Sequence, residues 1–212
     1  MYSTYNQLMR TKPKRPYRKQ KRAEAEEETR RRITEAAVQL HGTLGPARTT
    51  VTEVAERAGV SRMTVYNHFP TDADLFHACS AHWESRNPFP DPESWLRHTD
   101  PMGRVESALQ ELYGWYARKH GMLENVLRDA PLVPSLDAMM EERWGGYMDD
   151  VVAVLAQGWP GGPGEGRRLR TALRIVADLR TWRLLRESGL SAAAAARLAA
   201  RMVEGAASEC GG

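Results

Sequence analysis

Residues 49–69 constrain the fold most, because they describe two short helices, each with its own start signal, joined by a glycine turn. Thr50 followed by Glu53 is a capping box, in which the hydroxyl accepts from an early backbone N–H and the carboxylate reaches back. Gly59 stands where a helix end favours a left-handed residue, and Ser61 is a good N-cap for the second helix. The segment therefore predicts a helix-turn-helix, which can place its second helix in the major groove of DNA. A generic helical hairpin is the alternative.

Apolar residues in this segment recur at the three- and four-residue spacing of a helix that is buried on one face. We expect five of them to pack in a core rather than to touch a partner: Val54, Ala55, Val60, Val65 and Phe69.

The segment and its surroundings resemble the DNA-binding domain of the tetracycline-repressor (TetR) family of bacterial regulators. The likeness begins near Thr29 with TRRRITEAAVQLHGTLG, continues through TTVTEVAERAGVSRMTVYNHF and ends near Leu75-Phe76. It covers about a quarter of the chain, and it is specific because order, spacing and residue types all agree. The resemblance implies an all-α fold of about nine helices, with an N-terminal helix-turn-helix head and a C-terminal helical domain for ligand binding and dimerisation.

On this basis we expect a basic arm at 1–23, a DNA-binding domain at 24–77, and an effector-binding and dimerisation domain at 78–212. The resemblance further implies a homodimeric repressor that a small-molecule ligand releases from its operator. Two recognition helices about 34–36 Å apart would read a partial palindrome in double-stranded DNA.

The charge of the chain is uneven. Eight of its 30 Lys and Arg residues lie in residues 1–22, where there is no acidic residue. The rest of the chain has 22 basic and 27 acidic side chains, so its net charge is −5. A basic arm on an acidic body suits a polyanionic partner. Pro13, Pro16 and the charge density predict that the arm is disordered when free, whether or not it touches DNA.

Composition excludes several classes of protein. The 212 residues are 42% hydrophobic, without an apolar run long enough to span a membrane or an apolar stretch behind the first basic residues that would mark a secretory signal. Cys79 and Cys210 are too few for a disulfide framework. We therefore expect a cytoplasmic protein with no membrane partner.

Proline, glycine and apolar spacing predict the remaining helices. The first should begin within Glu24–Arg30, and Thr71 with Asp74 should cap the fourth. Further helices are expected at 101–121, 122–130, 135–157, 167–187 and 192–207, with a break at Gly121, loops at 87–92 and 158–166, and a kink or close approach at Gly145-Gly146. The last two helices would pair with their copies in a dimer, as the resemblance implies. An ordinary helix pair within one chain is the alternative.

The start of the second short helix should face DNA. Arg62 can bond guanine O6 and N7 together, and Met63 can contact a thymine methyl. The full set of candidate DNA-binding residues is Thr50, Thr52, Arg62, Met63, Thr64, Tyr66, Asn67 and His68. Thr64, Tyr66 and His68 are included because family members commonly use these positions. Asp72 departs from the family pattern, which often has a lysine there in contact with a phosphate.

The resemblance also implies a ligand cavity in the C-terminal domain. Aromatic and methionine side chains on its predicted helices could line that cavity: Trp83, Trp115, Met122, Trp144, Tyr147, Met148 and Trp182. Such a lining favours an apolar or aromatic effector. Plain core packing is the alternative for each of these residues taken singly.

No catalytic arrangement is evident in the sequence, so we expect neither an enzyme nor a cofactor. Cys79-x-x-His82 has a metal-like spacing, but two ligands do not make a site, and Cys79 falls on a core stripe. Two alternatives to a ligand-released repressor stay open. One is an architectural, low-specificity DNA-binding protein without an effector, and the other is a small-molecule binding protein whose DNA head has decayed.

Overall fold

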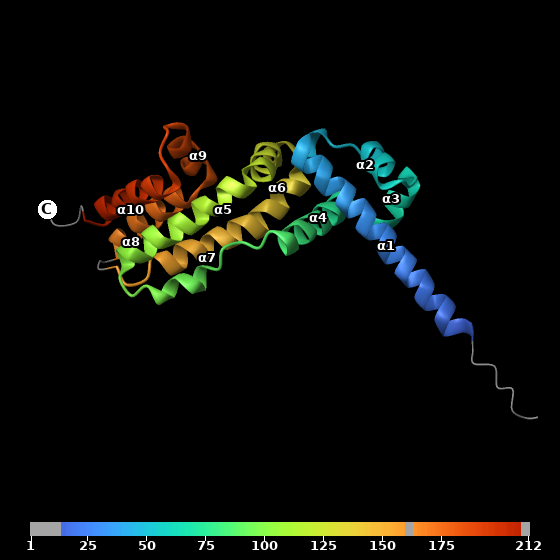
Figure 1. Cartoon of the computed structure of the whole chain (residues 1–212), viewed down its shortest axis with the longest axis horizontal. Coiled ribbons are helices and arrows are strands. Elements are labelled where there is room, and N and C mark those ends of the chain that lie inside the picture. The colour runs from blue at the N-terminus through green and yellow to red at the C-terminus, as the bar shows by residue number, and fades with distance from the viewer. Residues whose placement is uncertain (1–13, 160–162, 209–212) are drawn as a thin grey trace, which may run out of the picture.

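The computed structural model describes residues 14–159 and 163–208, and every regular element within these ranges is helical (Figure 1). The α-helices are α1 (Lys14–Thr43), α2 (Val51–Ala58), α3 (Arg62–His68), α4 (Asp72–Arg86), α5 (Pro101–Asp129), α6 (Pro134–Met140), α7 (Gly146–Leu155), α8 (Pro163–Ala177), α9 (Leu179–Glu187) and α10 (Ala192–Ser208). Four shorter turns join them: η1 (Pro46–Arg48), η2 (Pro92–Arg97), η3 (Ala130–Leu132) and the π-helical η4 (Glu141–Gly145). The expected all-α fold class is confirmed.

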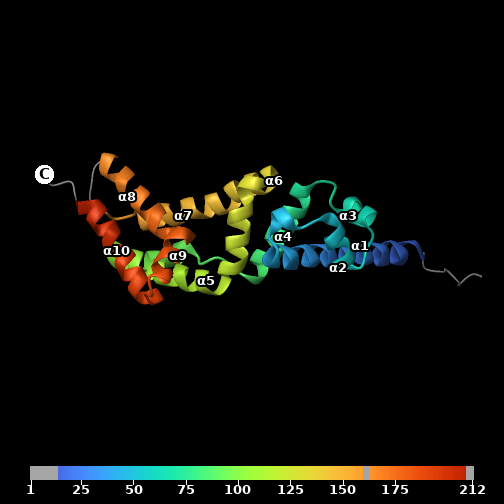
Figure 2. The same ribbon diagram turned by 90° about the horizontal axis from the view of Figure 1, so that it is seen from above.

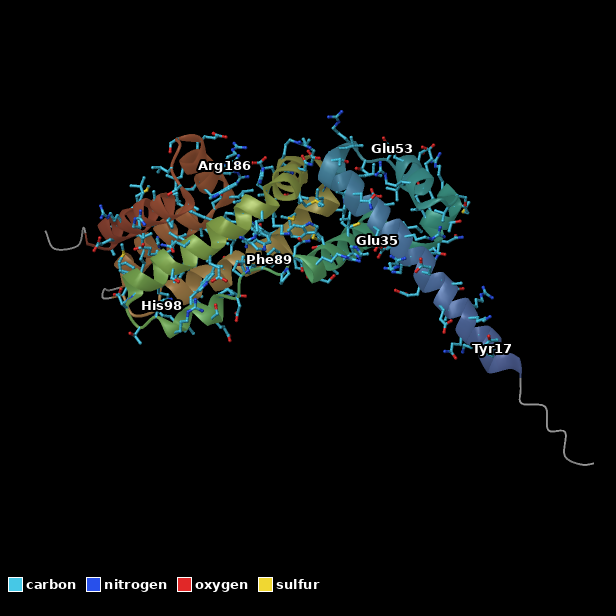
Figure 3. All side chains as sticks on the ribbon, in the orientation of Figure 1. Tyr17, Glu35, Glu53, Phe89, His98 and Arg186 are labelled. Carbon is cyan, nitrogen blue, oxygen red and sulfur yellow. The ribbon has the colours of Figure 1, made fainter. Side chains whose placement is uncertain are left out.

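The molecule is elongated, with α1, α2 and α3 forming a head at one end and α8 and α10 at the other (Figures 1 and 2). Helix α4 runs from the head toward the body. The N-terminal part of α1 projects past the head, with Tyr17 close to its free end (Figure 3). No helix in the described ranges is both long and apolar enough to cross a membrane.

The head has its own hydrophobic core. Its central side chains come from α1, α2, α3 with its C-cap residue, and the first half of α4, and they are at most 8% exposed: Ile33, Ala36, Ala37, Leu40, Val54, Ala55, Ala58, Val65, Phe69, Leu75 and Cys79. Four of the five residues that we expected to be buried are therefore confirmed, and Val60 packs against this core while remaining partly exposed. Since Leu75 and Cys79 lie on α4, the expected domain boundary at residue 77 falls inside a continuous helix.

The body is built around α5. Leu109 and Tyr113 of α5 have no exposed surface, and neither do Ala196, Ala199 and Ala200 of α10, whose small side chains let the two helices approach closely. Helix α10 is thereby packed against α5 in the core of the body.

Three helix boundaries differ from those expected. Helix α1 begins at Lys14 rather than within Glu24–Arg30, so residues 14–23 of the expected arm are helical, while residues 1–13 lie outside the described ranges. Gly121 does not break α5, since one glycine costs a helix only about 1 kcal/mol and Leu123, packed in the core two residues on, is 4% exposed. Helix α8 begins at Pro163, which shortens the loop expected at 158–166.

The helix expected at 167–187 is in fact two helices, α8 and α9, which meet at Asp178. Asp178 is extended and caps α9 by accepting a hydrogen bond from the backbone N–H of Arg180 at 2.7 Å. The hydroxyls of Tyr113 and Tyr116 each donate at 2.7 Å, to the carbonyls of Val176 and Ala177 respectively. The break therefore leaves no carbonyl unpaired at these two positions. Leu184 is 65% exposed on α9, although the apolar spacing of a single helix through 167–187 would place it inside.

A π-helical turn ends at Gly145-Gly146, where the sequence suggests a kink or a close approach. The turn η4 covers Glu141–Gly145, and α7 continues directly from Gly146. A single π turn within an α-helix shifts the register of the side chains that follow, and such turns are frequent at functional sites.

Candidate DNA interface and effector cavity

The two short helices of the head have the predicted caps. The hydroxyl of Thr50 accepts from the backbone N–H of Glu53 at 3.2 Å, and the Glu53 carboxylate accepts from the N–H of Thr50 at 2.8 Å. Gly59 is left-handed, with φ 65°, and the hydroxyl of Ser61 accepts from the N–H of Thr64 at 3.1 Å. Both helices therefore begin and end where the sequence indicates, and Glu53 marks this motif in Figure 3.

Helix α1 fixes the ends of both short helices through two arginines. Arg30 donates to the carbonyl of His68 at 2.7 Å, and its guanidinium lies 4.1 Å from the centre of the Phe69 ring. Arg32 donates to the carbonyl of Ala58 at 3.1 Å. A cation at a helix C-terminus is favourable because the last carbonyls there lack partners. Sequence reasoning missed these two residues, although the run of three arginines at 30–32 indicates that some of them have a structural or binding role.

The recognition helix α3 presents most of the predicted DNA-binding residues to solvent. Met63 is 68% and Tyr66 44% exposed, and Arg62 and Asn67 are exposed as well. Val65, on the opposite face, is 2% exposed and anchors the helix.

The other predicted residues are placed less uniformly. Thr50 and Thr52 are exposed at the start of α2, while Thr64 and His68 are half-buried. The hydroxyl of Thr64 lies 2.9 Å from that of Ser61, so this threonine is already engaged within the cap.

The start of α4 is acidic. Thr71 and Asp74 form the predicted capping box, with the N–H of Asp74 donating to the Thr71 hydroxyl at 3.2 Å. Asp72 is the first residue of α4 and is exposed. A carboxylate at a helix N-terminus stabilises the helix, but it repels any phosphate that approaches this end.

An apolar cavity of about 70 Å³ lies between the end of α1, helix α4 and the helices of the body. Its walls combine aromatic, methionine and a few polar side chains: Val38, His41, Pro46, Phe76, Cys79, Ser80, Trp83, Glu84, Phe89, Met122, Leu123, Val126, Leu136, Met139, Met140, Arg143 and Trp144. This volume holds a few water molecules. It is well below the roughly 300 Å³ at which sites for drug-sized ligands begin, so such a ligand requires the walls to move.

Three of the seven predicted ligand residues, Trp83, Met122 and Trp144, line this cavity. Trp115 is not among the wall residues. Its ring lies 5.8 Å from that of Trp83, and its indole N–H donates to the carbonyl of Pro88 at 2.9 Å.

The other three predicted ligand residues lie away from the walls. The ring of Tyr147 stacks on that of Phe89, with the ring centres 4.7 Å apart. Met148 and Trp182 are each 2% exposed and pack in the body core, as the alternative of plain core packing predicts. Sequence reasoning missed the wall residue Phe89, because its proline-rich loop has no periodicity. Phe89 is labelled in Figure 3.

The polar side chains of the cavity wall are paired or neutral. Glu84 of α4 and Arg143 of η4 form an ion pair that joins these two elements. The hydroxyl of Ser80 also donates to Glu84, at 2.7 Å. Burial lowers the pKa of His41 to about 4, against a smaller opposing effect of the Asp129 charge, so this imidazole is neutral at physiological pH.

Cys79 and His82, whose spacing resembles a metal-binding motif, lie in different surroundings on different sides of α4. The thiol of Cys79 is buried 3.8 Å from the carbonyl of Thr34, and burial raises its pKa to about 12. His82 lies beside Glu35 and Arg86 on another side of α4. Among the residues that the structure describes, no three His, Cys, Asp or Glu side chains are grouped to hold a metal ion.

A small helical head with two capped helices, the second exposed, on an all-helical body is the architecture of a bacterial helix-turn-helix DNA-binding regulator. Residues 33–79 match the profile described as bacterial regulatory proteins, tetR family. The head of this chain is therefore similar to the DNA-binding domain of this family, and the matches support a TetR-family transcriptional regulator.

Two curated relatives and one solved structure illustrate the likeness. The chain is 28% identical over 179 residues to the HTH-type transcriptional regulator TtgR of Pseudomonas putida, covering 78% of this chain and 85% of TtgR. It is 30% identical over 110 residues to the nucleoid occlusion factor SlmA of Haemophilus influenzae, about half of each protein (52% and 50%). A putative fatty acid metabolism regulator of Clostridium perfringens has the same fold, with a TM-score of 0.58 at 14% identity over 82% of this chain and 97% of the other.

Proposed function

We propose that this protein is a homodimeric, sequence-specific repressor that a small apolar or aromatic ligand releases from a partly palindromic operator. In this proposal residues 24–77 bind DNA, and residues 78–212 bind the effector and form the dimer. The proposed protein acts in the cytoplasm and is not an enzyme.

The observation that carries the proposal is the exposed face of α3. Arg62, Met63, Tyr66 and Asn67 stand free of the head core, while Val65 and Phe69 hold the helix from behind. The exposed methionine and tyrosine offer apolar surface whose burial against a partner would be favourable. Together with an arginine and an asparagine they form a set that can read base edges.

The dimer is supported by an apolar stripe at the far end of the molecule. Leu198 and Met202 lie one turn apart on α10 and are 44% and 52% exposed, and Ile175 of α8 is 52% exposed. Helices α8 and α10 also pack against each other. We infer that these two helices meet their copies there, which would bury the stripe and place two heads on one DNA duplex.

Release by a ligand is supported by the position of the cavity. Its walls include residues of α4, the helix that also contributes to the head core, and residues of α5, α6 and η4 in the body. A ligand that prefers a wider cavity would move α4 and thereby change the spacing of the heads. By linkage, DNA must weaken ligand binding by the same factor.

The test is selection of bound sequences from a random DNA pool by the purified protein at near-physiological salt. We expect a two-fold symmetric motif that disappears with Arg62→Ala and is kept with Arg118→Ala, which removes an equal charge from an exposed site on α5. Retention of DNA without any motif would contradict sequence-specific regulation. No retention would contradict DNA binding by this head and favour the decayed-head alternative.

An architectural role is the second candidate. It is favoured by the basic residues at the start of the chain, and by the similarity of about half of the chain to a protein called a nucleoid occlusion factor. The same selection separates the two candidates, since an architectural protein would retain DNA without a symmetric motif.

A further inference from the structure

We propose that the effector cavity binds lipophilic cations. Without a ligand, Arg143 is the internal counterion of Glu84, and the positive charge of the ligand replaces it. This inference rests on the proposed function, of which it specifies the ligand class and the first event of release.

The carboxylate of Glu84 is the fixed partner of the pair. It lies on α4 and is 21% exposed, and it accepts from Ser80 one turn earlier on the same helix at 2.7 Å. It also accepts from the guanidinium of Arg143 at two atoms, with the Nε–Oε1 distance at 3.0 Å. Since both residues line the cavity, the pair closes one side of it.

Arg143 is the partner that can leave. Its side chain is 35% exposed, so solvent can take up the released guanidinium. It lies in the π-helical turn η4, which Gly146 follows directly, so the backbone here resists rearrangement less than a regular helix does. Departure of so long a side chain would enlarge a cavity that is too small for a drug-sized ligand as it stands.

The surroundings of the pair favour a positive ligand. Trp83, Phe89 and Trp144 line the same cavity, and aromatic faces attract cations when water is excluded. His41, which also lines the cavity, is neutral and adds no positive charge. The hydrogen bonds to Glu84 raise the pKa of Arg143, and the negative charge of Glu142, in the same turn as Arg143, adds to this effect. With Arg143 withdrawn, the cavity keeps one carboxylate within an aromatic and methionine lining, which matches a cation on an apolar body.

The pair also connects the ligand to the head. Glu84 joins Arg143 of η4 to α4, whose first half contributes Leu75 and Cys79 to the head core. A cation that takes over Glu84 removes this connection between the body and α4. The ligand then favours the state in which the pair is broken, as any ligand that shifts an equilibrium must favour one state.

The experiment uses two ligands with the same chain and opposite charge. Binding of decyltrimethylammonium and of decanoate to the full-length protein without DNA is measured by calorimetry, below the concentrations at which they form micelles. We expect the wild type to prefer the cation. Glu84→Gln should weaken cation binding at least tenfold, and Arg143→Gln should strengthen it severalfold, because the competing internal charge is gone. Arg174→Gln, which removes the exposed Arg174–Asp149 pair at 2.6 Å, is the matched control and should change neither affinity.

The opposite order of effects would overturn the proposal. If the wild type prefers decanoate, and Arg143→Gln abolishes that binding while Glu84→Gln enhances it, the cavity is a site for anions. If the wild type binds neither, the assignment of ligand class is wrong. A preserved circular dichroism spectrum shows that each variant is folded. The comparison of the two ligands on the wild-type protein tests the proposal even if a variant does not fold. The operator assay is separate, so a failure here leaves sequence-specific DNA binding untouched, and the reverse also holds.

Discussion

The carboxylate of Asp129, at the end of α5, accepts a hydrogen bond from the backbone N–H of Ala47, 3.1 Å away in the turn that precedes α2. The same carboxylate accepts from Arg128 at 2.7 Å and is 2% exposed. Gly45, with φ 96°, lets the turn approach this closely, since a Cβ there would overlap the side chains of Arg128 and Asp129. The head is thus joined to the body at a second point, besides α4.

Removal of the Asp129 carboxylate should destabilise the protein. Asp129→Ala removes the buried acceptor of the Ala47 N–H and one of the acceptors of the Arg128 guanidinium. A hydrogen bond to a charged group contributes about 1.5–3 kcal/mol to stability. We therefore expect the free energy of unfolding in urea to fall by about that amount. Asp150→Ala, which removes an exposed carboxylate from α7, should stay within about 0.5 kcal/mol of wild type. Equal effects of the two variants would show that the hydrogen bond between Asp129 and Ala47 is not stabilising.

His41 should make the protein less stable in mild acid. Burial lowers its pKa in the folded state to about 4 from 6.5, so below pH 6.5 the unfolded chain takes up a proton that the folded chain does not. Stability from this group is complete above pH 6.5 and is lost as the pH falls toward 4, by about 2 kcal/mol at pH 5. Urea unfolding at pH 8 and pH 5 measures the loss. His41→Leu should reduce it, whereas His77→Leu, at an exposed site on α4, should leave it unchanged.

The head could be predicted almost residue by residue because its signals are local. A capping box, a left-handed glycine and an N-cap each act within four residues, and the structure contains all of them. What could not be predicted are contacts between distant residues, such as Arg30 with His68 or Asp129 with Ala47. These depend on the angle at which helices cross, which the pattern of a single helix does not contain.

The cavity was predicted only in outline, for the same reason. Trp83 and Trp182 are indistinguishable in sequence, since both are tryptophans on amphipathic helices, yet one lines the cavity and the other packs in the core. Glu84 and Arg143, 59 residues apart, were not singled out, because charges on helices usually face water. The break at Asp178 was missed because helical periodicity continues through it.

The apolar stripe on α8 and α10 should hold the dimer together. Leu198→Glu with Met202→Glu places two charges where we expect the copies to meet, so the purified protein should sediment as a monomer and bind a palindromic operator more weakly. Leu132→Glu is the matched control, because Leu132 is 70% exposed in η3, away from these helices. A variant pair that still sediments as a dimer would place the interface elsewhere.

The basic residues at the start of the chain should bind phosphates. Removing residues 1–22 deletes eight Lys and Arg side chains, of which Lys19, Lys21 and Arg22 are exposed on the projecting part of α1. We expect weaker binding to every DNA sequence, and a slope of log affinity against log salt that is shallower by about 0.9 for each phosphate that the deleted side chains would neutralise. Affinities measured at several salt concentrations give the slope, and an unchanged slope would show that this segment does not touch DNA.

Asp72 should limit the affinity of the head for DNA. It is exposed at the first position of α4, where a positive residue could reach a phosphate and a carboxylate repels one. Asp72→Lys should therefore raise affinity for all DNA sequences and steepen the salt slope by about 0.9. It should also destabilise the fold by about 0.3–1 kcal/mol, because a positive charge at a helix N-terminus is unfavourable. Asp137→Lys, in the first turn of α6, carries the same helix penalty away from the head and controls for net charge. If both variants raise DNA affinity equally, only the net charge matters, and Asp72 does not face the phosphates.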